Sequence, residues 1–385
     1  MPFSTVPLPA PLGAIDFSAP AMVAWLKAIK AQGEAVDLAS VPLILLGAGS
    51  VIAQGFVERL IARGHVIALV DNAKAGATVK GVPVIGDGDL DALTGKVSDA
   101  VGIVCCSSGA AVDHFVKLWN DRGPLVSWFE VISRSAPGDD IGGSFAFLRD
   151  FGDEKQILAL HAATRDVFDD VLSRQTFDAL MLYRLTWDAR VLAQVNRPEK
   201  AIYFEADVMP LGDHEVMVDG GAFDGDTVRD FAAKCAGRFA HVHSFEIDPR
   251  NAEAFLAGTA DIPHVSLHRI GLWNAPGEMG FEARTDNCSR LSDTASVKVP
   301  LDALDNLGLG RVSLFKLDIE GAEFEALQGA RRTIETYKPK LALSIYHKAG
   351  DFASLLPLVR DMRPDYRFRL RHYSSLIFDT VLYAT

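Results

Sequence analysis

The chain is poor in cysteine. Its 385 residues include four, Cys105, Cys106, Cys235 and Cys288, and no two of them form a CxxC pair. The sequence therefore predicts neither a zinc site nor a disulfide framework. Cys105 and Cys106 lie in an apolar run, where two small buried hydrophobic residues are the simpler interpretation.

Long apolar runs and an excess of basic charge are also missing. No run approaches the about 18 apolar residues that a membrane-spanning helix needs, and residues 1–5 lack the basic start and apolar core of a signal peptide. We therefore expect a cytoplasmic protein without a membrane partner. The 50 acidic and 38 basic residues give a net charge of −12, which argues against nucleic acid as a partner.

The composition is that of an ordinary globular protein, with 49% hydrophobic and 23% charged residues. A chain of 385 residues is long enough for two domains, on a prior of about 150 residues each. Small neutral or cationic molecules are the partners that fit the negative charge. Whether the chain forms a homo-oligomer is left open.

The most informative stretch is 218–227, where three glycines follow a short apolar run and precede a helical pattern. Glycines between a strand and a helix let backbone N–H groups approach a ligand closely. The neighbouring carboxylates of Asp219, Asp224 and Asp226 would repel a pyrophosphate. They would attract a cationic or hydroxyl-rich ligand such as S-adenosylmethionine.

A second strand is predicted at 240–246, with Glu246 at its carboxyl end. An acidic residue at this position can accept hydrogen bonds from both ribose hydroxyls of a nucleoside. The alternative is a glycine-rich turn between two strands with solvated acidic residues.

Six segments of the C-terminal half, in their order, resemble the FkbM family of S-adenosylmethionine-dependent methyltransferases. The segments are 219–227, 245–249, 271–273, 316–323, 346–348 and 371–374. The resemblance covers roughly residues 201–385. It implies a seven-stranded class I methyltransferase fold, S-adenosylmethionine as cofactor, and methyl transfer that is usually to a hydroxyl oxygen. We expect a small polyol-like acceptor, of which a sugar or a nucleotide-sugar is an example.

The resemblance also implies a set of cofactor-binding residues. In the first turn they are Asp219, Gly220, Gly221, Phe223, Gly225, Asp226 and Thr227. Glu246 would bind the ribose, and Ile247 and Leu272 would lie on either side of the adenine. Core packing is the alternative role of the last two.

Methyl transfer to an alcohol needs a base that removes the hydroxyl proton as the new bond forms. His347 follows the apolar run 341–346 and is the favoured base, because histidine titrates near neutral pH. Asp318 is the alternative base, and a structural histidine in a loop is the alternative for His347. Asp318 and Glu320 would lie on one side of the chain if the backbone stays extended.

The side chains of Asp318, Glu320 and His347 are also able to hold a divalent cation. Their spacing is a weak metal signal, so no metal is predicted. For Glu323 we favour a structural role at the start of the next helix, where a carboxylate stabilises the N-terminus.

The first half contains a βαβ pattern. A strand at 41–46 leads into Gly47 and Gly49, and a helix and a second strand ending at Asp71 follow. The glycines resemble a dinucleotide-binding fingerprint, but Ile52 stands where its third glycine belongs. Asp71 is suited to ribose hydroxyls. A nucleotide or nucleotide-sugar ligand and a purely structural role both stay open.

The predicted fold class is α/β, with two doubly wound parts. We expect an N-terminal arm and helix at 1–40, a smaller Rossmann-like domain at 41–132, a loop and helical connector at 133–200, and the methyltransferase domain at 201–385. A nucleotide-binding protein with a non-catalytic methyltransferase domain is the alternative function. An NAD-dependent oxidoreductase is disfavoured because the glycine fingerprint is incomplete.

Overall fold

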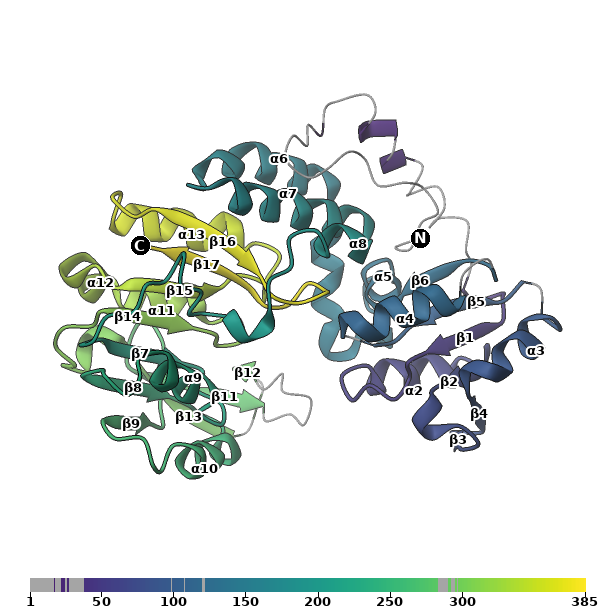
Figure 1. Ribbon diagram of the computed structural model, residues 1–385, viewed down its shortest axis with the longest axis horizontal. Coiled ribbons are helices and arrows are strands. Elements are labelled where there is room, and N and C mark those ends of the chain that lie inside the picture. Colours follow the sequence, from purple (N-terminus) through teal and green to yellow (C-terminus); the bar gives the residue numbers. More distant parts are fainter. Residues whose placement is uncertain are drawn as a thin grey trace. The chain divides into compact units, whose positions relative to one another are not determined.

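The computed structural model describes residues 17, 22–24, 26, 27, 38–97, 99–106, 108–119, 122–282, 290, 291, 295 and 297–385. The N-terminal arm and helix predicted at 1–40 lie largely outside the described residues. The chain forms two compact units (Figure 1). The first unit contains Met1–Arg165, Arg174–Asn196 and Ser374–Ile377, and the second contains Asp166–Ser173, Arg197–Tyr373 and Phe378–Thr385. Among the described residues, no helix is both long and apolar enough to cross a bilayer.

A six-stranded sheet in the order β3-β4-β2-β1-β5-β6 forms the centre of the first unit. Its strands are β1 Leu43–Leu46, β2 Val66–Val70, β3 Thr78–Val79, β4 Val82–Ile85, β5 Val101–Val104 and β6 Leu125–Ser127. β1 is apolar and buried throughout, as a central parallel strand should be, and pairs in parallel with β2 and β5. β3 pairs antiparallel with β4 and occupies the edge of the sheet.

Helices pack on this sheet and continue along the chain. Their bounds are α2 Gln54–Ala62, α3 Leu90–Thr94, α4 Gly109–Trp119, α5 Trp128–Ser133, α6 Glu154–Thr164, α7 Val171–Thr186 and α8 Ala189–Leu192. The 3-10 helices are η1 Asn72–Lys74, η2 Asp87–Asp89, η3 Asp140–Gly152 and η4 Arg165–Val167. Ile44 and Val104 of the sheet share a core with Phe115 and Trp119 of α4.

The second unit is built on a seven-stranded sheet in the order β16-β17-β15-β14-β7-β8-β9. The strands are β7 Val216–Gly220, β8 His241–Phe245, β9 Val265–His268, β14 Leu314–Leu317, β15 Lys340–Ser344, β16 Phe368–His372 and β17 Thr380–Ala384. All neighbours pair in parallel except β17, which is antiparallel to both β15 and β16. The seven-stranded sheet that the resemblance implies is confirmed, and its last two strands, β16 and β17, pair antiparallel.

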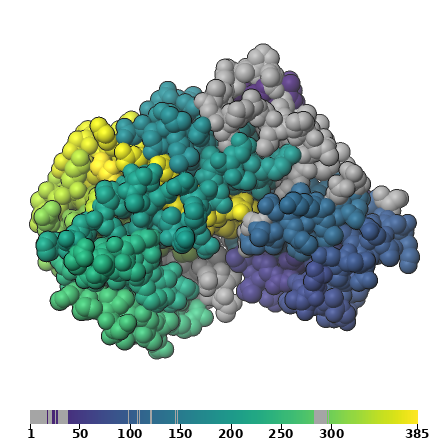
Figure 2. Space-filling model, in the orientation of Figure 1, coloured from purple at the N-terminus to yellow at the C-terminus, as the bar shows by residue number. Residues whose placement is uncertain are grey.

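Helices cover the faces of this sheet, and Figure 2 shows much of the surface of the unit in green to yellow. Their bounds are α9 Asp226–Lys234, α10 Pro249–Gly258, α11 Glu323–Gly329, α12 Arg331–Tyr337 and α13 Asp351–Met362, with η5 Glu199–Ala201 and η6 Leu304–Asn306. Met217 and Val242 of the sheet pack with Val228 and Phe231 of α9. Ala330 separates α11 from α12.

A small sheet, β10-β13-β11-β12, was not predicted. Its strands are β10 Gly271–Leu272, β11 Gly277–Glu282, β12 Arg290–Leu291 and β13 Val297–Asp302. Phe281, Val299 and Leu301 form its core, against which Ile247 packs. The sheet therefore adds an apolar surface beside the carboxyl end of β8.

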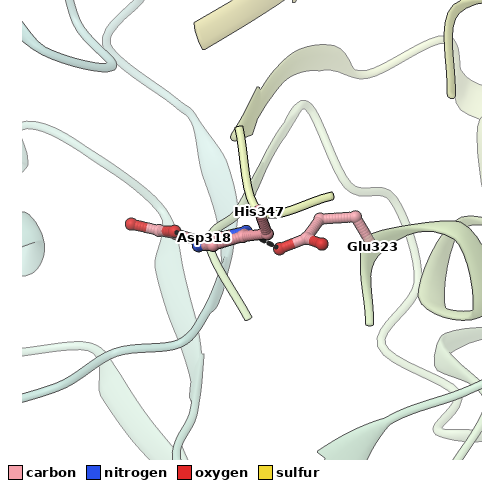
Figure 3. Close-up of side chains that lie close together, drawn as sticks. All are labelled: Asp318, Glu323 and His347. Carbon is pink, nitrogen blue, oxygen red and sulfur yellow. Dashed lines mark ion pairs between the residues drawn. The ribbon is translucent and has the colours of Figure 1, made fainter. Parts of the chain in front are cut away.

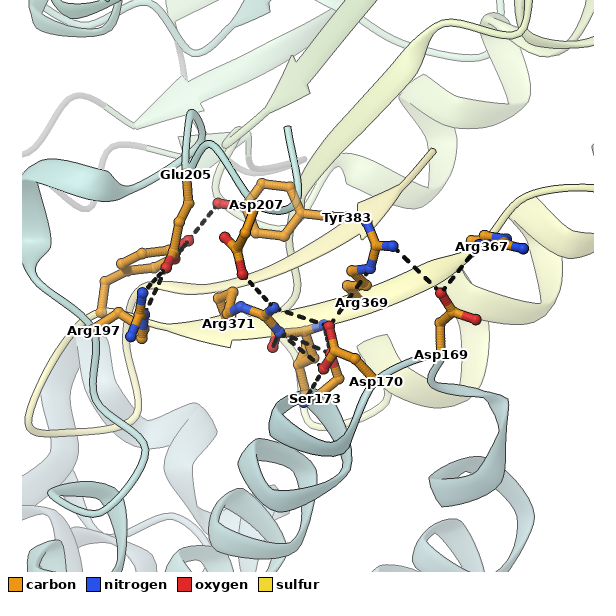
Figure 4. A network of polar contacts seen from close by, with 12 residues as sticks. Asp169, Asp170, Ser173, Arg197, Glu205, Asp207, Arg367, Arg369, Arg371 and Tyr383 are labelled. Atoms are coloured by element: carbon orange, nitrogen blue, oxygen red, sulfur yellow. Dashed lines mark hydrogen bonds and ion pairs between the residues drawn. The ribbon is translucent and has the colours of Figure 1, made fainter. Parts of the chain in front are cut away.

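A network around Arg371 ties residues before 210 to strand β16 (Figure 4). Arg371 is 2% exposed, and its Nη2 donates to Asp170 Oδ2 at 2.9 Å and to Asp207 Oδ2 at 3.0 Å. Its Nη1 donates to Ser173 Oγ at 2.9 Å. Because a buried guanidinium needs such partners, the segment 166–173 is a structural part of the second unit.

Candidate active site

A cavity of about 520 Å³ lies in the second unit, at the carboxyl ends of β7, β8 and β14. Most of the predicted site residues line it: Gly221, Phe223, Asp226, Thr227, Glu246, Ile247, Leu272, Asp318 and Glu320. Asp219, Gly220, Gly225 and His347 are not among the lining residues. Ligands of open α/β sheets bind outside the carboxyl ends of the strands, so this cavity is the candidate active site.

The glycine turn is shaped by the neighbouring strand. Gly221 has φ of +77°, and a Cβ at this position would stand 1.8 Å from the backbone carbonyl oxygen of Asp318. Only glycine permits this approach. The turn after β7 and the end of β14 are therefore held together at the cavity.

Asp219, which was expected in the first turn, lies inside β7. Its buried carboxylate lies 3.1 Å from Nζ of Lys316, which also donates to the carbonyls of Gly220 and Gly221 at 3.1 and 2.8 Å. Burial opposes the charge of Lys316, but the carboxylates of Asp219 and Asp318 outweigh it and raise the pKa of Lys316. Asp219 thus anchors a cation that itself lines the cavity.

Lys316 and Tyr203 are site residues that sequence reasoning did not assign. A lone lysine inside the apolar strand Leu314–Leu317 was the available signal for the first. For Tyr203, which stands far from the motifs in sequence, we find no such signal. Its ring lies under Lys316 Nζ, 5.1 Å from the ring centroid, and its side chain lines the cavity.

Glu246 is held in place by two backbone donors. Its Oε2 accepts from the N–H of Phe223 at 2.9 Å and its Oε1 from the N–H of Asp248 at 2.7 Å. The side chain is 8% exposed and lines the cavity. Burial raises the pKa of Glu246, against the effect of these donors. Each oxygen keeps acceptor capacity, as the binding of a ribose diol requires.

An aromatic residue is presented to solvent at the same turn. Phe223 has φ of +46° and is 39% exposed. A non-glycine residue with positive φ is uncommon and costs free energy, so its place is fixed by the surrounding turn. Ile247 and Leu272 also line the cavity, together with Phe281 of the small sheet. These three side chains give the cavity an apolar surface.

Asp318 presents a carboxylate at the end of β14. Tyr203 donates to its Oδ2 at 2.6 Å and Tyr346 to its Oδ1 at 3.2 Å. Burial raises the pKa of Asp318, but the charges of His347 and Lys316 and the tyrosine donor outweigh burial and lower it. The carboxylate is therefore ionised at neutral pH.

His347 lies between carboxylates (Figure 3). Its Nδ1 is 2.9 Å from Glu323 Oε1, and its Nε2 is 3.3 Å from Asp318 Oδ1 and 3.8 Å from Glu320 Oε2. Burial alone would lower the pKa of His347, but these carboxylates raise it to about 10. The ring is then protonated at neutral pH and cannot accept a proton. Its role as base stays a prediction, and the geometry favours Asp318.

Glu320 departs from the extended backbone that was assumed for it, with φ of +57°. It nevertheless lines the cavity with Asp318. Glu323 begins α11, as expected, and its Oε1 accepts from the N–H of Ile319 at 2.9 Å. Among the described residues, Asp318, Glu323 and His347 form the group able to hold a metal ion. A protonated His347 that pairs with the carboxylates of Asp318 and Glu323 explains the same arrangement without a metal ion.

Comparison with known proteins shows which family and which structures the chain is similar to. Residues 219–370 match the family model of the methyltransferase FkbM domain. A search of curated proteins finds no match. The crystal structure of methyltransferase FkbM from Methylobacillus flagellatus KT is similar over 93% of this chain and 98% of its own, with a TM-score of 0.73 and 24% identity.

Other solved structures are similar over less of the chain. An rRNA methylase from Streptococcus thermophilus matches 46% of this chain and 89% of its own, with a TM-score of 0.32 and 16% identity. A Streptococcus mutans protein described as a putative methyltransferase in complex with SAH matches 44% and 88%, with a TM-score of 0.30 and 11% identity. The family match and the Methylobacillus structure confirm the predicted fold class, a methyltransferase unit of the S-adenosylmethionine-dependent kind with a separate N-terminal sheet.

Proposed function

We propose, from the premise that residues 219–370 form a methyltransferase FkbM domain, that the chain methylates a hydroxyl oxygen of a small polyol-like acceptor such as a sugar or nucleotide-sugar. The observation that carries the proposal is a single cavity that holds a fixed carboxylate for a ribose, Glu246, and an ionised carboxylate for the acceptor, Asp318. S-adenosylmethionine, when bound, supplies the methyl group on a positively charged sulfur.

The residues present fit this cofactor. Glu246 offers acceptors to the ribose hydroxyls, and Ile247 and Leu272 offer the apolar wall to adenine. Asp226 and Thr227, at the start of α9, line the remaining wall and can hydrogen-bond the polar methionine end. The acidic first turn disfavours a phosphate group and suits a ligand with a net positive centre.

Asp318 is the residue we assign to proton removal. An alcohol becomes strongly acidic as its oxygen gains a methyl group, so even a weakly basic carboxylate can accept the proton at that stage. The tyrosine hydroxyls of Tyr203 and Tyr346 orient the carboxylate, and the positive charge of His347 keeps it ionised. Glu320 lines the same wall and can accept hydrogen bonds from further hydroxyls of the acceptor.

The test is methyl uptake from isotopically labelled S-adenosylmethionine by a panel of sugars, polyols and nucleotide-sugars, with amines of similar size for comparison. We expect a methyl ether as product, identified by mass spectrometry and NMR. Transfer only to the amines would overturn the oxygen specificity. Tight cofactor binding without transfer to any acceptor would favour the alternative, a nucleotide-binding protein with a non-catalytic methyltransferase domain.

A further inference from the structure

The first unit has a crevice where its sheet changes direction. The chain runs from β1 outward to β2, then returns to β5 on the other side of β1. Ligands of doubly wound sheets bind at the carboxyl ends of the strands on either side of such a point. A cavity of about 410 Å³ lies there, within the range of roughly 300–1,000 Å³ typical of small-molecule sites. Gly47 and Ser50 after β1, Asp71 and Asn72 after β2, and Cys106 and Ser108 after β5 line it.

The glycines after β1 are required by close contacts in this crevice. Gly47 has φ of +74°, and a Cβ there would stand 2.8 Å from Cε2 of Phe115. A Cβ on Gly49 would stand 2.1 Å from Oδ2 of Asp71. The loop therefore lies directly against the Asp71 carboxylate, and any side chain at residue 49 would displace it.

Asp71 is fixed at the end of β2. Its Oδ1 accepts from the N–H of Ala73 at 2.9 Å, and this hydrogen bond orients the carboxylate. A carboxylate at the end of the second strand of a βαβ unit is placed to accept ribose hydroxyls. The crevice thus offers a polar anchor for a nucleoside.

The charge around the loop distinguishes this crevice from the cavity of the second unit. Helix α2, which follows the loop, has no acidic residue in its first turn, whereas α9 has Asp226. Nζ of Lys74 lies 3.6 Å from the position that a Cβ on Gly49 would take. A cation beside a glycine loop that leads into a helix N-terminus is favourable for phosphate.

The missing third glycine does not block the loop. Ile52 stands at that position, but α2 begins only at Gln54, and its N-cap Ala53 is 0% exposed. Close packing of a helix start against a sheet requires a small residue. Here the buried alanine, one residue later, meets that requirement.

We infer that the first unit binds a nucleoside diphosphate, with Asp71 accepting the ribose hydroxyls and the 47–50 loop and Lys74 facing the phosphates. The diphosphate is the part shared by ADP-like nucleotides, dinucleotides and nucleotide-sugars. This site is separate from the proposed methyl transfer and does not depend on it.

The test is calorimetric titration of the full chain with ADP, UDP, NAD and UDP-glucose. We expect at least one to bind, with an affinity that saturating S-adenosylmethionine leaves unchanged, and the preferred ligand identifies the source of the diphosphate. No binding of any of the four at millimolar concentration would overturn the proposal. So would binding that S-adenosylmethionine displaces, since that would locate the nucleotide in the second unit.

Variants test the assigned contacts. Asp71→Asn should weaken binding of the preferred nucleotide by about 10- to 100-fold, as loss of a hydrogen bond to a ligand group does. A nucleotide that lacks the ribose 2′-hydroxyl should bind the unaltered chain more weakly than the parent nucleotide does. The Asp71→Asn variant should bind the two nucleotides equally, because the substitution and the loss of the hydroxyl remove the same interaction. Asp113→Asn, the same substitution at an exposed position of α4, should change nothing.

Lys74→Ala should weaken binding of the nucleoside diphosphate more than binding of the nucleoside. Equal affinity of the Asp71→Asn and Asp113→Asn variants would reject the site. Unchanged urea unfolding of the Asp71→Asn and Asp113→Asn variants shows that the first unit is folded.

Discussion

At the scale of single residues, the surroundings of His347 set its charge. In the folded protein the pKa of His347 is about 10, against an ordinary value of 6.5, because three carboxylates outweigh its burial. Protonation is therefore stronger in the folded state than in the unfolded state. The resulting stabilisation is fully present below about pH 6.5 and is lost as the pH rises through about 10.

We therefore expect the free energy of unfolding to fall between pH 7 and 10 in the unaltered protein and to fall less in His347→Gln. Urea unfolding of both proteins over this range measures the difference. Parallel pH dependences would show that His347 is not charged in the fold.

The proton acceptor is tested by comparing Asp318→Asn with His347→Gln. Asp318→Asn should keep S-adenosylmethionine affinity and lose on the order of 10²–10⁴ in turnover. His347→Gln removes the cation that lowers the pKa of Asp318, so the acidic limb of its pH–rate profile should move to higher pH. If His347 is the base instead, its variant should have the larger loss in turnover and Asp318→Asn the smaller.

Glu246 is the residue whose loss should affect cofactor binding most directly. Glu246→Gln replaces one acceptor by a donor that faces backbone N–H groups, which should lower S-adenosylmethionine affinity by about 1–3 kcal/mol. Glu253→Gln, on the exposed side of α10, is the matched control. Calorimetry that gives both variants the same affinity would remove Glu246 from the cofactor site.

At the scale of elements, strands β7 and β14 are joined by more than their backbone pairing. Lys316 of β14 reaches across to the Asp219 carboxylate of β7, and both side chains are buried. Lys316→Met should cost about 3–5 kcal/mol, because it leaves a buried carboxylate without its partner. The double variant Asp219→Asn with Lys316→Met should recover part of this loss in urea unfolding. Additive losses would show that the two side chains act independently.

The sequence was sufficient to locate the strand ends that carry the carboxylates. Short apolar runs that end in Glu246 or Asp318 predict both the strand and the edge of the sheet at which the side chain emerges. The carboxyl end of β7 is harder to predict from sequence, because it contains Asp219 and Gly220 and both residue types are depleted in strands. Both residues pair with β8 and with β14, which lie elsewhere in the sequence.

Sequence patterns predict neither the small sheet nor the protonation state of His347. β10 and β12 have two residues each, too short to show a period. The charge of His347 depends on Glu323, Asp318 and Glu320 approaching it in space. A pattern of residue types along the chain contains no such distances.

At the scale of the whole molecule, the second unit includes chain that the predicted boundary at residue 201 leaves out. Asp170, Ser173 and Arg197 pair with residues beyond that boundary. A fragment of residues 201–385 should therefore still bind S-adenosylmethionine, since the cavity residues are present, but unfold at lower urea concentration than a fragment of residues 166–385. Equal midpoints would mean that the Arg371 network adds no stability.

The way the chain alternates between its two units also bears on how the protein is made. Residues 374–377 belong to the first unit, although nearly all of that unit precedes residue 197. On a ribosome, domains generally fold as units and the N-terminal one first. Here the first unit lacks residues 374–377 until most of the second unit has been synthesised. Nascent chains should therefore complete the strands of the first unit early, since all of them precede residue 128, and add residues 374–377 to that unit only near the end of translation.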